Sequence, residues 1–131
     1  MRPDKKVSTP SHAWVQTFPN PVTVCDRNGI ITEMNNAAAE SLADSGGRAL
    51  LGQSLLDCHP EPARSVVRDL LATGRTNIYT IQKNGRRKLI VQSPWYHDEQ
   101  RAGIVELSIP LPDIIPHFDR DPERPLPAGE K

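Results

Sequence analysis

The sequence predicts an α+β domain built on an antiparallel sheet, with helices covering one side of the sheet. Two Asn-Gly dipeptides, Asn28-Gly29 and Asn84-Gly85, stand between β-branched runs, and this dipeptide favours hairpin turns because both residues tolerate positive φ. Between the two hairpins, residues 63–71 carry apolar side chains at helical spacing. Strand runs on both sides of a helical segment are typical of α+β domains.

Length and composition limit the class of protein. A chain of 131 residues forms one domain that buries roughly two thirds of its unfolded surface. Its 16 basic and 16 acidic residues cancel, so no net field favours nucleic acid or a membrane surface as a partner. No window approaches the roughly 20 apolar residues of a membrane span. Two cysteines without an export signal indicate reduced thiols and a cytoplasmic location.

The N-terminal third predicts a leader followed by a hairpin and short helices. Residues 1–17 are expected to be a leader, disordered over the first ten, with a short helix or a loose lead-in across residues 11–18. Residues 22–26 and 30–34 are predicted strands around Asn28-Gly29. Asn35 or Asn36 then caps an alanine-rich helix over 37–43, and further helical turns follow over 48–56.

The longest predicted helix begins after a proline-rich corner. Its apolar residues lie at i, i+3, i+4, i+7 and i+8 and form one stripe: Ala63, Val66, Val67, Leu70 and Leu71. Pro62 suits the first helical position, where its missing N–H costs nothing. Gly74 is predicted to end the helix in a left-handed cap.

Three strands are predicted after this helix, over residues 76–83, 86–93 and 102–109. Pro94 should end the middle strand or create a bulge, because proline cannot donate to a sheet. In the last strand Val105 and Leu107 alternate with Glu106, so we expect the valine side to be buried and the glutamate side to face water. The domain is expected to span residues 18–111, and residues 112–131 to form an extended or disordered tail.

Four local motifs in this order resemble the PAS (Per-Arnt-Sim) sensory domain family. Residues 24–31 (VCDRNGII) resemble the family's opening strand pair, and residues 36–40 (NAAAE) its first helix. Residues 50–61 resemble the family's pattern of leucines, a glycine and a His-Pro pair, and residues 103–109 its last strand. The resemblance implies a five-stranded sheet in the order 2-1-5-4-3, with the helices closing one face over a small pocket.

The function that this resemblance implies is sensory. We expect a small cytoplasmic domain of a bacterial regulator that binds a small-molecule ligand or a signalling protein and acts as a homodimer. The alternative is a protein–protein interaction module with a packed core and no ligand. An enzyme is not expected, since no catalytic set or phosphate-binding loop occurs. An enzyme with a fold of this size would also need a buried acid or base on the sheet face, whereas Glu106 is predicted to face water.

The expected binding residues follow from the same resemblance. Family members pair through the segment before the first strand and the open sheet face, which implies Trp14, Val15 and Phe18 as dimer contacts. The ligand pocket is expected to be lined by Met34, Leu42, Leu55, Leu56, Cys58, His59, Val67, Leu71, Tyr79, Val91, Trp95 and Val105. The alternative to a pocket or interface role for Trp95 and its neighbour Tyr96 is that one ring anchors the core while the other lies at its rim.

The cofactor is unknown, although two common ones are disfavoured. Leu55 occupies the position of the reactive cysteine in flavin-binding members, and Val67 stands about where haem-binding members carry the ligand histidine. Cys58 and His59 are adjacent and lack the spacing of a zinc site, so no metal is expected. His59 is predicted to bond to the backbone before Pro60, with a ligand or pH-sensing role as the alternative. The basic residues around Asn84-Gly85 indicate a solvated hairpin tip and not a nucleic-acid site.

Overall fold

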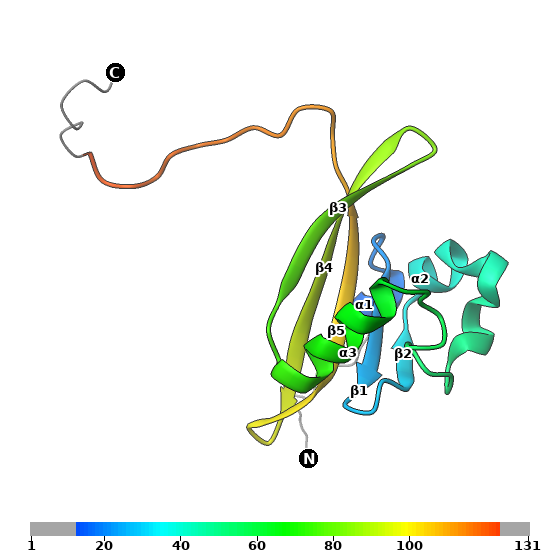
Figure 1. The fold of residues 1–131 in the computed structure, drawn as a ribbon. Coiled ribbons are helices and arrows are strands. Elements are labelled where there is room, and N and C mark those ends of the chain that lie inside the picture. The colour runs from blue at the N-terminus through cyan, green and yellow to red at the C-terminus, as the bar shows by residue number, and fades with distance from the viewer. Residues whose placement is uncertain (1–12, 124–131) are drawn as a thin grey trace, which may run out of the picture.

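A computed structural model describes residues 13–123 of the chain, so the predictions for residues 1–12 and 124–131 lie outside the described part. Two strands, a helical segment and three further strands follow one another in the expected order (Figure 1). The elements are α1 (Ala13–Thr17), β1 (Val22–Asp26), β2 (Ile31–Met34), α2 (Asn36–Ser41), the 3-10 turns η1 (Ala43–Ser45) and η2 (Gly47–Leu50), α3 (Ala63–Thr73), β3 (Asn77–Lys83), β4 (Arg86–His97) and β5 (Gln100–Pro110).

The strands form one antiparallel sheet in the order β2-β1-β5-β4-β3, which confirms the predicted order. The last strand, β5, lies in the centre between the two hairpins. The helical segment carries the chain from one edge, β2, to the other edge, β3 (Figure 1). The central position of β5 lets residues from both hairpins meet along it.

The core lies between the sheet and the helices α2 and α3. It contains Cys25, Ile31, Met34, Ala38, Leu55, Val67, Leu70 and Ile104. The predicted apolar stripe of α3 supplies Val67 and Leu70, each 1% exposed. Gly74 caps α3 in the left-handed conformation as predicted, while Pro62 is the N-cap and not the first helical residue.

The pairing registers show which side chains share a face of the sheet. Cys25 pairs with Ile104, and both belong to the core, so they mark the helix-covered face, called the inner face below. Because side chains alternate along a strand, Glu106 lies on the inner face with Ile104, and Val105 lies on the opposite, outer face. The prediction that the Val105 side is buried and the Glu106 side is wet was therefore wrong.

Both Asn-Gly pairs form turns, but β4 departs from its predicted end. Asn84 and Gly85 both have positive φ, as a two-residue hairpin requires. Strand β4 continues through Pro94 to His97, and the bulge falls between Trp95 and Tyr96. The final hairpin turns at Asp98 and Glu99, which both have positive φ.

Asn35 ties the start of the domain to the helical segment. Its Oδ1 accepts hydrogen bonds from the backbone N–H groups of Val22 and Ala38, both at 2.9 Å. Its Nδ2 donates to the carbonyl oxygens of Phe18 and Asn20. Of the two predicted caps, Asn35 is thus the one that caps α2, and it is 1% exposed.

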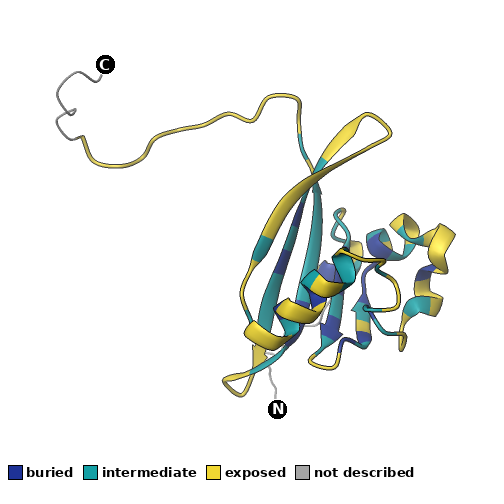
Figure 2. Cartoon of the chain, viewed as in Figure 1, coloured by how far each residue is buried: buried dark blue, intermediate teal, exposed yellow. Residues whose placement is uncertain are grey.

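The two edges of the sheet differ in exposure. The β2 edge is covered by the loop after η2, because Ile31 exchanges backbone hydrogen bonds with Gly52 and Gln53. The β3 edge has no such cover, and Figure 2 shows it almost entirely exposed. Half of the inner face, on β3 and the adjoining part of β4, therefore lies open beside α3.

Residues 112–123 form neither helix nor strand, and they lead away from the sheet (Figure 1). The apolar side chains of Ile114, Ile115 and Phe118 are exposed there. Within residues 13–123, no helix is long and apolar enough to cross a membrane.

Candidate functional site

A row of three polar side chains crosses the inner face of the sheet. Asn77 on β3 pairs with Gln92 on β4, which pairs with Glu106 on β5. Asn77 Nδ2 donates to Gln92 Oε1 at 2.9 Å, and Gln92 Nε2 donates to Glu106 Oε1 at 2.8 Å. Thr23 on β1 pairs with Glu106 and continues the same row. These four residues, called the polar row below, run across the inner face from β1 to β3.

The polar row is shielded from water. Gln92 is 3% exposed and Thr23 is 8% exposed, while Glu106 is partly buried. Burial and then the Glu106 charge raise the pKa of the Tyr79 phenol. Burial also raises the pKa of the Cys25 thiol, and Glu106 adds to that shift. Glu106 thus acts electrostatically on both of these groups.

Two hollows flank the polar row, and together they form what we call the inner groove. One, of about 350 Å³, lies beside α3 and is lined by His59, Ala63, Val66, Arg75, Asn77, Tyr79 and Gln92. The other, of about 180 Å³, lies beside α2 and is lined by Pro21, Thr23, Ser41, Leu42, Ile81, Lys83, Lys88, Ile90, Glu106 and Ser108. Both hollows combine apolar side chains with several polar ones, so a ligand could meet both kinds of contact there.

Three of the predicted pocket residues line the inner groove. His59 and Tyr79 line the hollow beside α3, and Leu42 lines the hollow beside α2. The His59 ring bonds through Nδ1 to the carbonyl oxygen of Leu55 at 2.8 Å, as predicted for a residue that enters the helix. Its Nε2 has no protein partner among residues 13–123.

Other predicted pocket residues fill the core instead. Met34, Leu55 and Val67 are 2%, 6% and 1% exposed and pack in the core cluster, with Leu56 and Leu71 against it. Cys58 is exposed and lines a separate hollow at the surface near η2. The five core side chains stabilise the fold, and neither they nor Cys58 line the inner groove.

The prediction that Val91, Val105 and Trp95 line the pocket on the helix side was wrong. Val91 pairs with Leu107, and Ser93 pairs with Val105, so both valines lie on the outer face. Trp95 pairs with Gly103, one residue from the inner-facing Ile104, and therefore also belongs to the outer face. All three errors have one cause: the side chains of β4 and β5 that were expected on the helix-covered face lie on the outer face.

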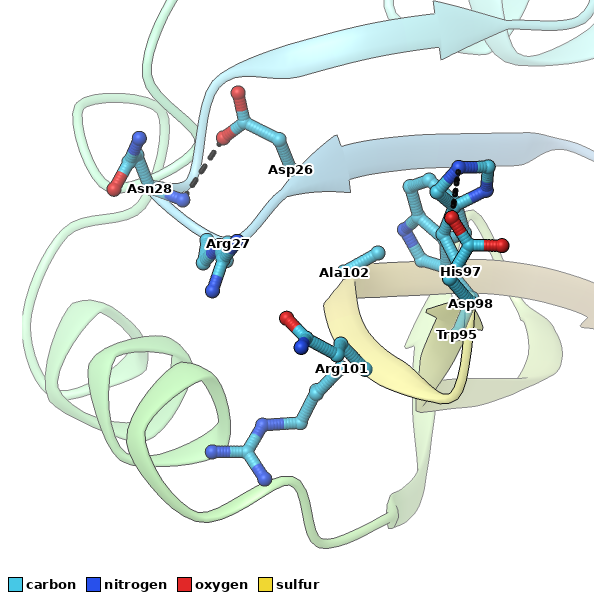
Figure 3. A pocket seen from close by; sticks show the side chains of 9 residues that line it. Asp26, Arg27, Asn28, Trp95, His97, Asp98, Arg101 and Ala102 are labelled. Carbon is cyan, nitrogen blue, oxygen red and sulfur yellow. Dashed lines mark hydrogen bonds and ion pairs between the residues drawn. The ribbon is translucent and has the colours of Figure 1, made fainter.

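Trp95 lines a different hollow, of about 450 Å³, at the end of the sheet where two turns meet. Figure 3 shows its walls: Asp26 and Asn28 from the first turn, and His97, Asp98 and Arg101 from the last hairpin. Arg101 extends toward α3, where its guanidinium donates to the carbonyl oxygen of Ala72. His97 and Asp98 form a highly exposed ion pair, so this hollow is open and polar.

Sequence reasoning missed Asn77, Gln92, Glu106 and Thr23. In the sequence they are polar residues at alternate strand positions, and this pattern usually indicates the solvent-facing side of a sheet. Only the register across four strands shows that these residues form one row.

Comparison with known families agrees with this architecture. The family model described as PAS fold matches residues 12–105. The chain belongs to the PAS family. PAS is a family of sensory domains whose members are generally regulatory and not catalytic.

Solved PAS structures share the fold at low sequence identity. The PAS domain of Bordetella pertussis BvgS is 20% identical, with a TM-score of 0.61 over 78% of this chain and 84% of that chain. The Aer2 receptor from Vibrio cholerae, described as a dual PAS-heme oxygen sensor, is 18% identical (TM-score 0.52, 71% and 95% coverage). The PAS domain of the histidine kinase ThkA is 20% identical (0.56, 69% and 98%). No curated protein matches the chain significantly.

The residues of this PAS domain do not fit the haem or flavin chemistry considered from the sequence. Val67 and Leu55 both lie in the core cluster, and neither side chain can ligate iron or form a covalent adduct. Within residues 13–123, no cluster of His, Cys, Asp and Glu suited to a metal ion occurs.

The three predicted dimer residues lie at the start of the described chain. Trp14 is 63% exposed, whereas Val15 is buried. The Trp14 and Phe18 rings form an edge-to-face pair with centroids 6.0 Å apart. Trp14 thus presents apolar surface to solvent, while Val15 packs within the protomer.

Proposed function

We propose that this PAS domain is a cytoplasmic sensor that binds a small ligand in the inner groove and transmits the signal as a homodimer. The observation that carries the proposal is the polar row. Gln92 and Glu106 are polar side chains on the covered face, beside two hollows, where a packed core would place apolar residues. Such groups fix the orientation of a ligand whose body lies on the apolar walls.

Several observations support the other parts of this proposal. The outer face carries Val91, Val105 and Leu107, and Ile78 on the same face is 59% exposed. This surface suits a second copy, since exposed apolar patches mark interaction sites, and Trp14 adds further exposed apolar area. Cys25 and Cys58 are both free thiols, which supports a reducing compartment.

The second candidate is a ligand-free interaction module, and the same outer face favours it. In that case the inner groove stays unoccupied, and the apolar outer surface binds a protein partner.

Native mass spectrometry of freshly purified protein, together with its visible absorption spectrum, tests the first candidate. We expect a mass beyond that of the bare chain. Ala63→Trp and Ser41→Trp, which obstruct the two hollows, should remove it. Ala72→Trp, at an exposed position of α3, is the matched control and should retain it. A bare dimer without visible absorption would support the interaction module instead.

A further inference from the structure

Within the described range 13–123, the carboxylate of Glu106 has one hydrogen-bond partner, the side-chain amide of Gln92. Among residues 13–123, no Lys, Arg or His forms an ion pair with it. A partly buried carboxylate is usually paired, because removing it from water without compensation is costly. The inference that follows rests on the proposed function, since it concerns the ligand of the inner groove.

The direction of the hydrogen bonds in the polar row defines what Glu106 still needs. An ionised carboxylate only accepts hydrogen bonds, so Gln92 turns its Nε2 toward Glu106 and its Oε1 toward Asn77. Only Oε1 of Glu106 accepts from the protein within residues 13–123, which leaves Oε2 available. A ligand that meets Glu106 must therefore bring a donor, and a cationic donor would also neutralise its charge.

Opposite charge lies at the other end of the same hollow. Lys83 and Lys88 line it together with Glu106, and neither lysine is ion-paired with a carboxylate among the described residues. Lys88 pairs with Pro110, four residues beyond Glu106 on β5. The two positions are thus roughly 13 Å apart along the strand, and the long lysine stems can shorten the gap between the charged groups.

The wall between the two charged ends carries apolar side chains together with the hydroxyl groups of Ser41 and Ser108. Leu42, Ile81 and Ile90 line this part of the hollow. Its volume of about 180 Å³ is below the roughly 300 Å³ at the lower end of drug-sized sites. The hollow therefore suits a ligand with few non-hydrogen atoms and an aliphatic middle.

We propose that the hollow beside α2 binds a small aliphatic ω-amino acid, with its ammonium group at Glu106 and its carboxylate at Lys83 and Lys88. This arrangement gives each of the three charged side chains a partner of opposite charge. It also places the aliphatic part against Leu42, Ile81 and Ile90.

The test is an NMR titration of the isotopically labelled 131-residue chain with amino acids and their single-charge analogues. The amino acids are 4-aminobutanoate, 5-aminopentanoate and 6-aminohexanoate. The analogues of 5-aminopentanoate are pentylamine, which lacks the carboxylate, and pentanoate, which lacks the ammonium. We expect at least one amino acid to shift the amide signals of β4 and β5 around Ile90 and Glu106. Loss of either charged end should weaken binding by about tenfold or more, the value of one charge-assisted hydrogen bond.

Two variants assign the charged ends. Glu106→Gln should weaken binding of the amino acid and the amine about tenfold but leave the carboxylate analogue unchanged. Lys88→Met should weaken binding of the amino acid and of the carboxylate analogue but leave binding of the amine unchanged. Glu33→Gln, on β2 opposite Val24 and away from the groove, is the matched charge control and should change neither.

Four outcomes would overturn the proposal, and they separate it from the proposed function. Equal affinity for the amino acid and for either single-charge analogue, or an unchanged affinity in Glu106→Gln, rejects the zwitterion but leaves ligand sensing in place. The same holds when no amino acid binds and native mass spectrometry finds another compound in the groove. No bound compound and no shift with any probe reject both.

Discussion

The indole N–H of Trp95 donates a hydrogen bond to the carbonyl oxygen of Cys25 at 2.9 Å, which joins β4 to β1 across the intervening β5. Gly103 makes this contact possible, because it is the β5 residue that pairs with Trp95 and has no side chain beneath the ring. The Trp95 ring is thus a structural link across the sheet and not part of the inner groove.

Replacing Trp95 with Phe should therefore affect stability and not ligand binding. The variant keeps an aromatic ring but removes the donor, so we expect a loss of about 1 kcal/mol in the free energy of unfolding. Urea denaturation measures it, and Tyr96→Phe, at an exposed position, is the control. A changed ligand affinity with unchanged stability would contradict this structural role.

Replacing Gly103 with Ala should prevent normal folding. A Cβ at this position would lie 1.9 Å from the carbonyl oxygen of Cys25, and its φ is +152°. Since backbone cannot move aside cheaply, we expect a loss of at least about 4 kcal/mol. Gly52→Ala is the matched control, because Gly52 also has positive φ (+85°) but meets nothing within 4 Å, and it should lose only about 1–2 kcal/mol. Thermal unfolding followed by circular dichroism distinguishes the two.

The fold was largely predictable from local signals. The Asn84-Gly85 turn, the apolar stripe of α3 and the Gly74 cap each act within a few residues, so sequence spacing alone indicates them. The end of β4 was not predictable in this way. Proline usually interrupts a strand, yet Pro94 still pairs with Ile104 because the neighbouring strands maintain the sheet on both sides.

The candidate site was less predictable because its residues meet only through the register of the sheet. Apolar alternation in β5 favoured burial of Val105 and Leu107, but an apolar face can be an interaction surface as well as a core. Glu106 and Gln92 look like solvent-facing residues in their own strands. Only the core partner of β5, Cys25, shows that the helices cover the Glu106 side.

Replacing Asn35 with Ala should cost far more than replacing its neighbour. The variant removes the cap of α2 and leaves the buried N–H of Val22 and the carbonyls of Phe18 and Asn20 without this partner. We expect a loss of more than about 3 kcal/mol, since each buried unsatisfied group costs about 1–3 kcal/mol. Asn36→Ala, whose exposed side chain bonds only to Arg48, should cost less than about 1 kcal/mol. Equal losses in chemical denaturation would show that Asn35 does not tie these segments together.

The two thiols should react with a disulfide reagent at very different rates. Cys58 is exposed, although burial and the Asp57 charge raise its pKa, so it should react fast but more slowly than a free thiol. Cys25 is 1% exposed and should react at least about a thousandfold more slowly, because the domain must open first. Cys58→Ser should abolish the fast phase, whereas two fast thiols in the unmodified chain would contradict the burial of Cys25.

Stability should fall in alkaline solution through groups beneath the helices. Burial and the Glu106 charge raise the pKa of Tyr79 above its ordinary value of 10.0, so the folded chain keeps a proton that the unfolded chain has released. The contribution of Tyr79 is complete below pH 10 and is lost as pH rises through the higher folded pKa. Cys25, with its pKa raised above 9.0, acts in the same direction.

Tyr79→Phe and Glu106→Gln separate these contributions. Tyr79→Phe should flatten the decline above pH 10, and Glu106→Gln should reduce it, because removing the Glu106 charge lowers the pKa of both Tyr79 and Cys25. The free energy of unfolding in urea at pH 8 and pH 11 measures the slope, with Tyr96→Phe as the control. A slope that Glu106→Gln leaves unchanged would mean that the carboxylate does not act on the phenol or the thiol, and that the inner groove is better solvated than its burial indicates.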